Sequence, residues 1–360
     1  MQYDLGKKAL LVTYPNKFSI LEARSLAETA GYHIVGEEFQ KNLTRSRFGV
    51  GKGKAETIKE AVAQRNADII LFDEVLKPSQ QYNLARLCKV DVIDREKMIL
   101  EIFTTHAVTN ESRIQVKLAQ LKYDIVRVKE KTRSAKLGEQ PGFYGLGKYD
   151  ADIHILDIKR RTSILLKKLK QEEKKRELHR IQRLVQDTPL IALTGYTSAG
   201  KTTLFNLLVE EKKDTSPNVF TTLTTYTRSL HIKEKKFLLT DTIGFISKLP
   251  PYMIQAFRST LSELNYANLI LLILDFSEDV QGIRKKLISS IKILSALQIP
   301  ISKCILVLNK VDMVLNTEIE DKLSQLRSFV SINHMVPISA SNNYNVQSLK
   351  NLILDESFSN

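Results

Sequence analysis

One motif constrains the fold of this chain more than any other feature. The pattern Gly-x-x-x-x-Gly-Lys-[Ser/Thr] is present as Gly195-Tyr196-Thr197-Ser198-Ala199-Gly200-Lys201-Thr202, with Thr203 directly after it. An apolar segment, Leu190–Leu193, precedes the motif, and a second apolar segment begins at Leu204. A glycine-rich turn between a strand and a helix surrounds a phosphate group with backbone N–H groups and a helix N-terminus. We therefore expect an α/β domain with a mostly parallel sheet and a phosphate-binding loop (P-loop).

Two polar residues of the motif have defined roles in such a loop. The Lys201 ammonium would contact the β- and γ-phosphates of a nucleotide, and the Thr202 hydroxyl would bind Mg²⁺. A second motif, Asp241-Thr242-Ile243-Gly244, follows the apolar strand Phe237–Leu239. The Asp241 carboxylate would hold the Mg²⁺ ion through water, and the Gly244 amide would reach the γ-phosphate.

Two further motifs favour guanine as the base. Asn309-Lys310-Val311-Asp312 follows the strand Ile305–Leu308. A carboxylate at Asp312 would accept hydrogen bonds from guanine N1–H and N2–H₂, a donor pair that adenine lacks. Asn309 would hold the loop, and the Lys310 stem would cover one face of the base. Ser339-Ala340 follows another short apolar strand, and the Ala340 N–H would meet guanine O6.

The segment between the P-loop and Asp241 is rich in threonine. It includes Phe220-Thr221-Thr222 and continues to Arg228. We expect Thr222, with Thr221 as the second candidate, to complete the Mg²⁺ shell only when the γ-phosphate is present. The segment would relax after hydrolysis. An alternative interpretation is that the run is simply an edge strand. Lys201, Thr222 and Gly244 are the predicted catalytic residues.

The residue after Asp-Thr-Ile-Gly bears on the rate of hydrolysis. Many GTPases have a glutamine there, which orients the attacking water. This chain has Phe245, whose side chain neither donates nor accepts a hydrogen bond. We therefore expect slow hydrolysis by the protein alone and stimulation by a partner that completes the site.

The remainder of the chain suggests two more regions. The first 95 residues alternate short apolar strands with amphipathic helices, which favours a parallel doubly wound sheet. The region 96–187 has a helical pattern from Glu96 to Leu121, a glycine-rich loop over 134–150, and a second helical pattern from Ala151 to Leu184. We expect three domains, 1–95, 96–187 and 188–360. Gly49–Lys54 lacks the first glycine and the final Ser or Thr of a P-loop, so a turn before a helix is expected there.

Charge indicates a polyanionic partner. The formal net charge is +14, and residues 158–183 hold eleven Lys or Arg against three Glu. A helix with this charge suits RNA phosphates, although a solvated helix that serves solubility is an alternative. Aromatic residues of the glycine-rich loop (Phe143, Tyr144, Tyr149) would stack on exposed bases or anchor the loop.

The two cysteines are far apart, which argues against disulfides and thiolate zinc sites. With no long apolar run and no secretory pattern at the start, we expect a cytoplasmic protein. We also expect the protein to be a monomer.

Taken together, these motifs resemble the HflX family of ribosome-associated GTPases. The resemblance rests on the P-loop run with Leu204-Phe205-Asn206, on Phe220-Thr221-Thr222-Leu223, and on Asp241–Ile246 with Leu249-Pro250. N-terminal stretches agree, notably Phe72–Leu84 and Gln115–Tyr123. Two departures suggest a divergent, archaeal-type branch: the glycine-rich loop lacks the usual Arg and Glu, and Thr224-Thr225 replaces Asp-Pro.

The resemblance implies an N-terminal α/β domain, a long basic helical pair and a C-terminal P-loop GTPase domain. It also implies a Mg²⁺-dependent GTPase that binds the large ribosomal subunit in the GTP state and splits or rescues stalled ribosomes. Two alternatives stay open at this point. One is a GTPase of RNA maturation or modification, and the other is a signalling switch that binds a protein effector without nucleic acid.

Overall fold

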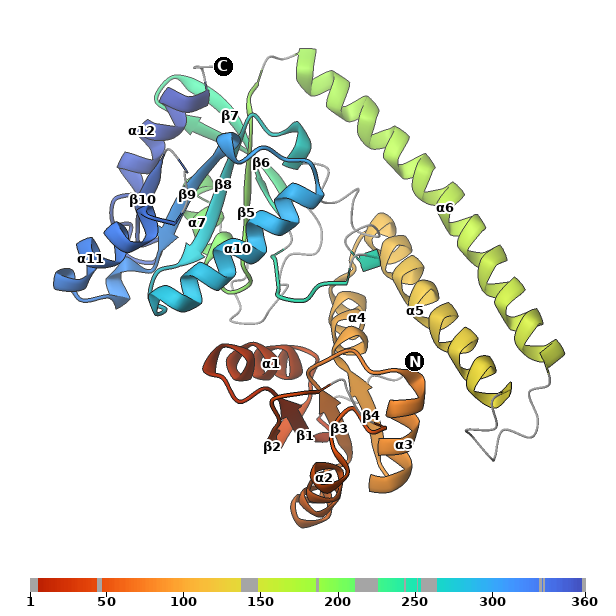
Figure 1. Ribbon diagram of the computed structural model, residues 1–360. Helices are drawn as coiled ribbons and strands as arrows, with labels where there is room; N and C mark the ends of the chain where they lie inside the picture. The colour runs from red at the N-terminus through yellow and green to blue at the C-terminus, as the bar shows by residue number, and fades with distance from the viewer. Residues whose placement is uncertain are drawn as a thin grey trace. The chain divides into compact units, whose positions relative to one another are not determined.

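The computed structural model describes residues 6–43, 47–136, 148–185, 188–210, 226–242, 244–250, 252–253, 264–329, 332 and 334–357 (Figure 1). The chain divides into two compact units, Met1–Gln171 and Glu172–Asn360. Each unit contains its own sheet, so each is described by itself.

The first unit contains a four-stranded sheet in the order β2-β1-β3-β4, and all its strands are parallel. Its strands are β1 (Lys8–Thr13), β2 (His33–Phe39), β3 (Ile69–Phe72) and β4 (Asp91–Asp94). Its helices are α1 (Lys17–Thr29), α2 (Lys52–Arg65), α3 (Pro78–Cys88), α4 (Arg95–His106), α5 (Asn110–Lys136) and most of α6 (Lys148–Val185). The turn expected at Gly49–Lys54 leads into α2, whose N-cap is Gly51.

Alternation along the strands explains why helices cover both faces of this sheet. Leu10 and Val12 of β1 pack in one buried cluster with residues of α2 and α3. Ala9 and Leu11 of the same strand pack in another cluster with residues of α1 and α4. Successive side chains of a strand point to opposite faces, so an uninterrupted apolar strand requires cover on both sides. Figure 1 shows α1 and α2 on opposite sides of the sheet.

Buried charges join the carboxyl edge of this sheet to its helices. The Arg95 guanidinium, at the start of α4, pairs with Asp73 after β3 and with Glu22 of α1 at 2.5 Å. All three side chains are buried, and the Thr13 hydroxyl donates to Asp73 at 2.7 Å. The two terminal nitrogens of Arg95 each pair with one of these carboxylates, so an internal ion cluster holds this edge together.

The helical region differs from its prediction at two points. The single pattern expected from Glu96 to Leu121 is divided into α4 and α5, because the Thr109 hydroxyl accepts a hydrogen bond from the Ser112 amide at 3.1 Å and caps a new helix. The two helices also enter the range 134–150 predicted as a loop, since α5 extends to Lys136 and α6 begins at Lys148. The stacking residues Phe143 and Tyr144 lie outside the described residues, as does the side chain of Tyr149.

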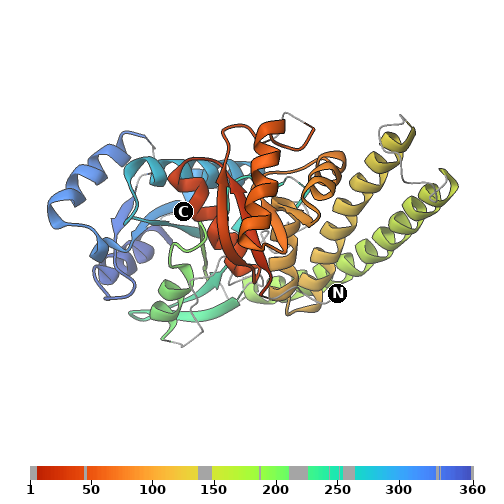
Figure 2. The same cartoon turned by 90° about the horizontal axis from the view of Figure 1, so that it is seen from below.

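Helix α6 runs back antiparallel to α5 (Figures 1 and 2). Positions 155, 158, 162, 165 and 169 of α6 are buried or half-buried and form one face of the helix. Leu166 falls outside this face and is 51% exposed.

The second unit contains a six-stranded sheet in the order β10-β9-β8-β5-β7-β6, in which only the edge pair β6–β7 is antiparallel. Its strands are β5 (Leu190–Gly195), β6 (Tyr226–Ile232), β7 (Lys235–Asp241), β8 (Leu269–Asp275), β9 (Cys304–Asn309) and β10 (Met335–Pro337). Its helices are α7 (Lys201–Val209), α10 (Val280–Ala296), α11 (Asn316–Arg327), α12 (Val346–Ser357) and the short 3₁₀ turns η1 (Ile301–Lys303) and η2 (Val311–Met313). The expected fold class, parallel α/β with a mostly parallel sheet in this unit, is confirmed.

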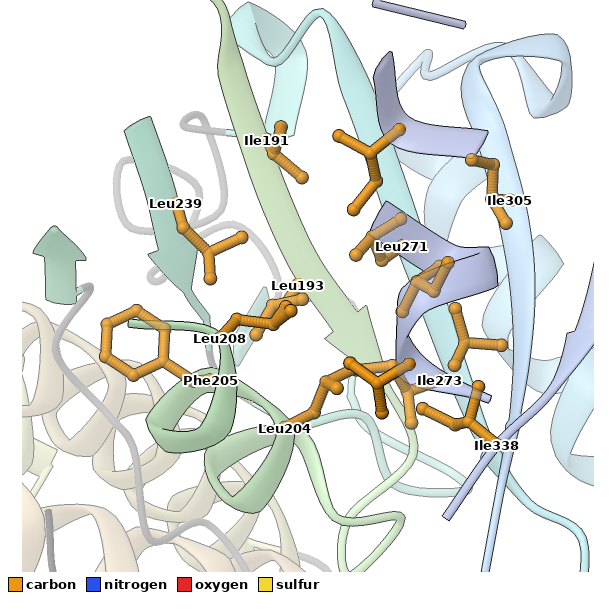
Figure 3. Packing of buried hydrophobic residues seen from close by; sticks show 14 of the residues in the cluster. Ile191, Leu193, Leu204, Phe205, Leu208, Leu239, Leu271, Ile273, Ile305 and Ile338 are labelled. Atoms are coloured by element: carbon orange, nitrogen blue, oxygen red, sulfur yellow. The ribbon is translucent and has the colours of Figure 1, made fainter. Parts of the chain in front are cut away.

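The core of the second unit fixes the P-loop helix against the sheet. Figure 3 shows Leu204, Phe205 and Leu208 of α7 packed with Ile191 and Leu193 of β5. The members of this cluster shown in the figure are completely or almost completely buried. Because β5 lies between β7 and β8, the loop that follows β5 opens at the carboxyl edge where the neighbouring parallel strands also end.

Candidate functional site

The P-loop turns sharply at its two glycines. Gly195 ends β5 with φ +137°, and a Cβ built there would lie 2.1 Å from the Ile273 carbonyl oxygen. Gly200 has φ +88°, and its Cβ would lie 2.2 Å from Asn309 Nδ2. Both positions therefore require glycine for conformation and for space. Ser198 also lies in the left-handed region, at φ +61°, so the loop reverses between β5 and α7.

Lys201 begins α7 and lies within the loop. Its side chain is buried, and Nζ donates a hydrogen bond to the Tyr196 carbonyl oxygen at 2.7 Å. Burial lowers the pKa of Lys201 to about 8, against the opposing effect of the nearby Asp241 carboxylate. A desolvated ammonium in a ring of backbone groups is a strong attractor for a phosphate anion.

Thr202 and Asp241 are brought together as predicted. The Thr202 hydroxyl donates to Asp241 Oδ2 at 3.1 Å, and both side chains are buried. Asp241 ends β7, and the next residue, Thr242, donates its hydroxyl proton to the Leu193 carbonyl oxygen at 2.7 Å. An alcohol and a carboxylate side by side are the oxygen donors that Mg²⁺ prefers, so these residues fit that ion. Thr203, the next residue of α7, is half-buried.

Gly244 lies directly against the P-loop. A Cβ built at Gly244 would lie 2.9 Å from Lys201 Nζ and 2.9 Å from Thr197 Cγ2. The following residue, Phe245, is buried and forms an isolated parallel bridge with Tyr196. The segment after Asp241 thus lies beside the Lys201 ammonium.

Asn309 joins two loops. Its Nδ2 donates to the Ala199 carbonyl oxygen in the P-loop at 2.9 Å, and its Oδ1 accepts from the Ala340 amide at 2.9 Å. The loop-holding contribution predicted for Asn309 is therefore visible in its contacts. The Ala340 amide, which we expected to meet guanine O6, donates to Asn309 in this structure. The Ser339 hydroxyl accepts from the Asn342 amide at 3.1 Å and so shapes the same turn.

The other two base-site residues follow β9. Lys310 has φ +69°, and its Nζ pairs with Asp275 Oδ2 at 2.6 Å. Asp312 lies in η2 with an exposed side chain, so its carboxylate is accessible to a ligand. The predicted residues Phe220, Thr221 and Thr222 lie outside the described residues.

Two residues of the site were missed at the sequence level. Asp275 ends the apolar strand β8 as Asp241 ends β7, and this repeated pattern of a polar residue after an apolar strand was the available signal. Lys286 of α10 lies with Nζ 4.9 Å from the centroid of the Tyr196 ring. Nothing in the local sequence singles out Lys286, because α10 carries several lysines and only the fold decides which of them approaches the loop.

Within the described ranges, no group of three or more His, Cys, Asp or Glu side chains is arranged to hold a metal ion. None of the helices described combines the length and apolar character needed to span a membrane.

Comparison with known proteins covers both units. Residues 17–104 match a family described as "GTP-binding GTPase N-terminal", residues 106–183 match "GTP-binding GTPase Middle Region", and residues 190–310 match "50S ribosome-binding GTPase". A GTP-binding protein of Sulfolobus solfataricus, solved in complex with GDP, superimposes with a TM-score of 0.52 at 27% identity and 98% coverage of both chains.

The curated relatives include "GTPase HflX" from three organisms. The Methanocaldococcus jannaschii protein is 39% identical over 96% of this chain and 85% of its own length. The Thermococcus kodakarensis protein is 36% identical over 90% of this chain and 74% of its own length. The Escherichia coli protein is 34% identical over 87% of this chain and 75% of its own length. The resemblance stated from the motifs is thereby confirmed, and so is the expectation that this chain is a GTPase: it belongs to the HflX family.

Proposed function

We propose that the carboxyl edge of the second sheet binds GTP with Mg²⁺. The buried Lys201 ammonium would hold the β- and γ-phosphates, and the loop amides would surround them. Thr202, Asp241 and Thr222 would be the ligands of the ion, directly or through water. When bound, Mg²⁺ neutralises charge on the β- and γ-phosphate oxygens. The support is the contact between the Thr202 hydroxyl and Asp241, placed beside Lys201.

Guanine would be selected by Asp312, whose exposed carboxylate can accept two hydrogen bonds from the base. Asn309 would act indirectly by tying the Ser339-Ala340 turn to the P-loop. The Ala340 amide would turn from Asn309 towards guanine O6 or share its proton between them. Lys310, held by Asp275, would cover the base with its aliphatic stem.

Hydrolysis by the chain alone should be slow. Phe245 offers no polar side chain to the attacking water, and its side chain is buried. The Gly244 amide and the hydroxyl of Thr222 would therefore supply the γ-phosphate contacts. We propose that a ribosome-bound geometry completes the site and accelerates the reaction.

The proposal of a ribosomal partner is supported by the exposed basic surface of α6. Eight lysine or arginine side chains of this helix are exposed: Lys159, Arg160, Arg161, Lys167, Lys168, Lys170, Lys174 and Lys175. Of these eight, within the described part of the chain, only Arg161 and Lys175 form ion pairs, with Asp157 and Glu172. Such charges are available to RNA phosphates, so we propose that α6 contacts ribosomal RNA of the large subunit in the cytoplasm.

A cycle follows from these assignments. GTP would order the threonine-rich segment, favour the ribosome-binding state and, for stalled ribosomes, promote separation of the subunits. Hydrolysis would relax that segment and release the protein. Separation of subunits rests on family membership, whereas nucleotide binding rests on the site itself.

Co-sedimentation tests the proposal. The chain is centrifuged with ribosomes, and with isolated subunits, in GDP and in a non-hydrolysable GTP analogue at several salt concentrations. Two matched variants sharpen the test: Lys167→Glu with Lys168→Glu on α6, and Lys233→Glu with Lys236→Glu on the exposed β6–β7 hairpin.

We expect binding to the large subunit with the analogue, and weakening of about tenfold or more for the α6 variant only. In a plot of the logarithm of the binding constant against the logarithm of salt concentration, the slope should become shallower by about one for each phosphate group that the α6 variant no longer neutralises. Equal binding in both nucleotides would contradict the cycle. Equal weakening by the α6 and hairpin variants would show nonspecific electrostatic attraction, and unchanged binding of the α6 variant would show that its charges serve solubility.

A further inference from the structure

Tyr196 connects three parts of the GTPase unit. It is the second residue of the P-loop motif, and its side chain is 2% exposed. Its hydroxyl oxygen accepts a hydrogen bond from the Ser247 amide at 2.6 Å. Its carbonyl oxygen accepts from Lys201 Nζ at 2.7 Å, and Lys286 Nζ of α10 lies 4.9 Å from its ring centroid. One residue therefore contacts the phosphate-binding lysine, the segment after Gly244, and a neighbouring helix.

The backbone beside Tyr196 reinforces this connection. The Phe245 amide donates to the Gly195 carbonyl oxygen at 2.8 Å, and the Thr197 amide donates to the Phe245 carbonyl oxygen at 2.8 Å. With the Ser247–Tyr196 hydrogen bond, three hydrogen bonds hold residues 245–247 against the P-loop. The last of the three depends on a side chain, so a substitution at Tyr196 can loosen this attachment without deleting backbone groups.

Lys286 contacts the ring of Tyr196. Its Nζ pairs with Glu278, and its charge also acts to lower the pKa of Lys201. A cation over the face of a tyrosine is attracted to the ring electrostatically, so Lys286 restricts the orientation of Tyr196. The Tyr196 hydroxyl is thus fixed in direction before any ligand arrives.

We propose that Tyr196 is a positioning residue for GTP hydrolysis, acting through the Ser247 amide on Gly244. This inference rests on the proposed binding of GTP in the P-loop. Because position 245 is phenylalanine, γ-phosphate recognition in this segment depends on where its backbone lies. Gly244 is three residues from Ser247 and borders Lys201 Nζ, so attachment at Ser247 limits the movement of the Gly244 amide. Contacts to the α- and β-phosphates come from the loop and do not require this attachment.

The test is Tyr196→Phe, which removes the hydroxyl and keeps the ring under Lys286. Three quantities are measured: the Kd for GDP, the Kd for a β,γ-imido analogue of GTP with Mg²⁺, and the single-turnover rate of GTP hydrolysis. The control is Tyr32→Phe in the first unit, a buried tyrosine that likewise loses one hydrogen bond, to Glu101 at 2.8 Å. Thermal unfolding of both variants separates a loss of stability from a loss of positioning.

For Tyr196→Phe we expect two changes of about fivefold to tenfold, the usual effect of removing one hydrogen bond. The ratio of the affinity for the analogue to the affinity for GDP should fall by this factor, and so should the single-turnover rate. Lys286→Met keeps the hydroxyl and should lower the same rate by about twofold to threefold. Tyr32→Phe should change neither quantity.

If Tyr196→Phe kept the wild-type ratio of analogue affinity to GDP affinity and the wild-type single-turnover rate, the inference would be overturned. An equal loss of GDP and analogue affinity would also overturn it, because that result would describe a damaged loop. A wild-type chain that binds neither nucleotide would refute the proposed function itself, which is a distinguishable result.

Discussion

Replacing Lys201 by methionine is expected to stabilise the nucleotide-free protein while abolishing its binding of GTP. The folded chain lowers the pKa of this lysine from 10.5 to about 8, mainly through burial. Below pH 8, keeping the ammonium charged therefore costs the folded state about 3 kcal/mol relative to the unfolded chain. Methionine has a similar length and no charge, so the substitution removes this cost.

The gain is partly offset. Without the ammonium, the Tyr196 carbonyl oxygen loses a hydrogen bond of 2.7 Å, at a cost of about 1 kcal/mol. Asp241 loses the attraction of a nearby positive charge. The net expectation is that the free energy of unfolding rises by about 1–2 kcal/mol at pH 7.

The effect has a defined pH dependence. Between pH 8 and 10.5 the unfolded lysine keeps its proton while the folded lysine loses it, so the unfolded state binds more protons. Wild-type stability therefore rises with pH across this window through this group. The advantage of Lys201→Met should shrink over the same window.

The assay compares wild type, Lys201→Met and the exposed control Lys292→Met without nucleotide, in EDTA, at pH 7 and pH 10. Because the chain has no tryptophan, unfolding is followed by far-UV circular dichroism. Hydrogen exchange of β5 and α7 peptides assigns the change to the GTPase unit. A Lys201→Met protein that is less stable than wild type at pH 7, or an advantage that is the same at both pH values, would refute the reasoning.

Three other substitutions have expected outcomes. Asn309→Ala should lower the free energy of unfolding by about 2–4 kcal/mol and weaken GDP binding in calorimetry, because the Ala199 carbonyl oxygen and the Ala340 amide lose a buried partner; unchanged GDP affinity would show that the junction is dispensable. Asp312→Asn should change stability by less than about 0.5 kcal/mol, since the side chain is exposed, but weaken GDP binding about a hundredfold and favour xanthine nucleotides, whose C2 carbonyl accepts from an amide. Arg95→Met should destabilise the first unit by about 3–5 kcal/mol in thermal unfolding, because two carboxylates stay buried without their cation, and a loss below about 1 kcal/mol would contradict that account.

Local sequence was sufficient for most of the helices and strands and for the positions of the motifs along them. Strand β5, the P-loop glycines and Lys201 were predicted because their signal lies within one short stretch, where spacing alone constrains the backbone. The same holds for Asp241 and Asn309, since each follows an apolar strand whose carboxyl end must reach a common edge of the parallel sheet. The division between α4 and α5 was missed because the apolar periodicity continues past the turn in which the Thr109 hydroxyl caps α5.

The tertiary structure alone decided the contacts between residues that are far apart in the chain. The Tyr196 hydroxyl meets Ser247, Lys286 lies over the Tyr196 ring, and Lys310 pairs with Asp275. Each pair joins segments separated by tens of residues, and its partners are chosen by the order of strands in the sheet. The sequence therefore determined which residue types are available to the proposed phosphate and base sites, because those residues lie in local motifs. The tertiary structure determined which side chains hold those motifs together, because distance in space is set by packing.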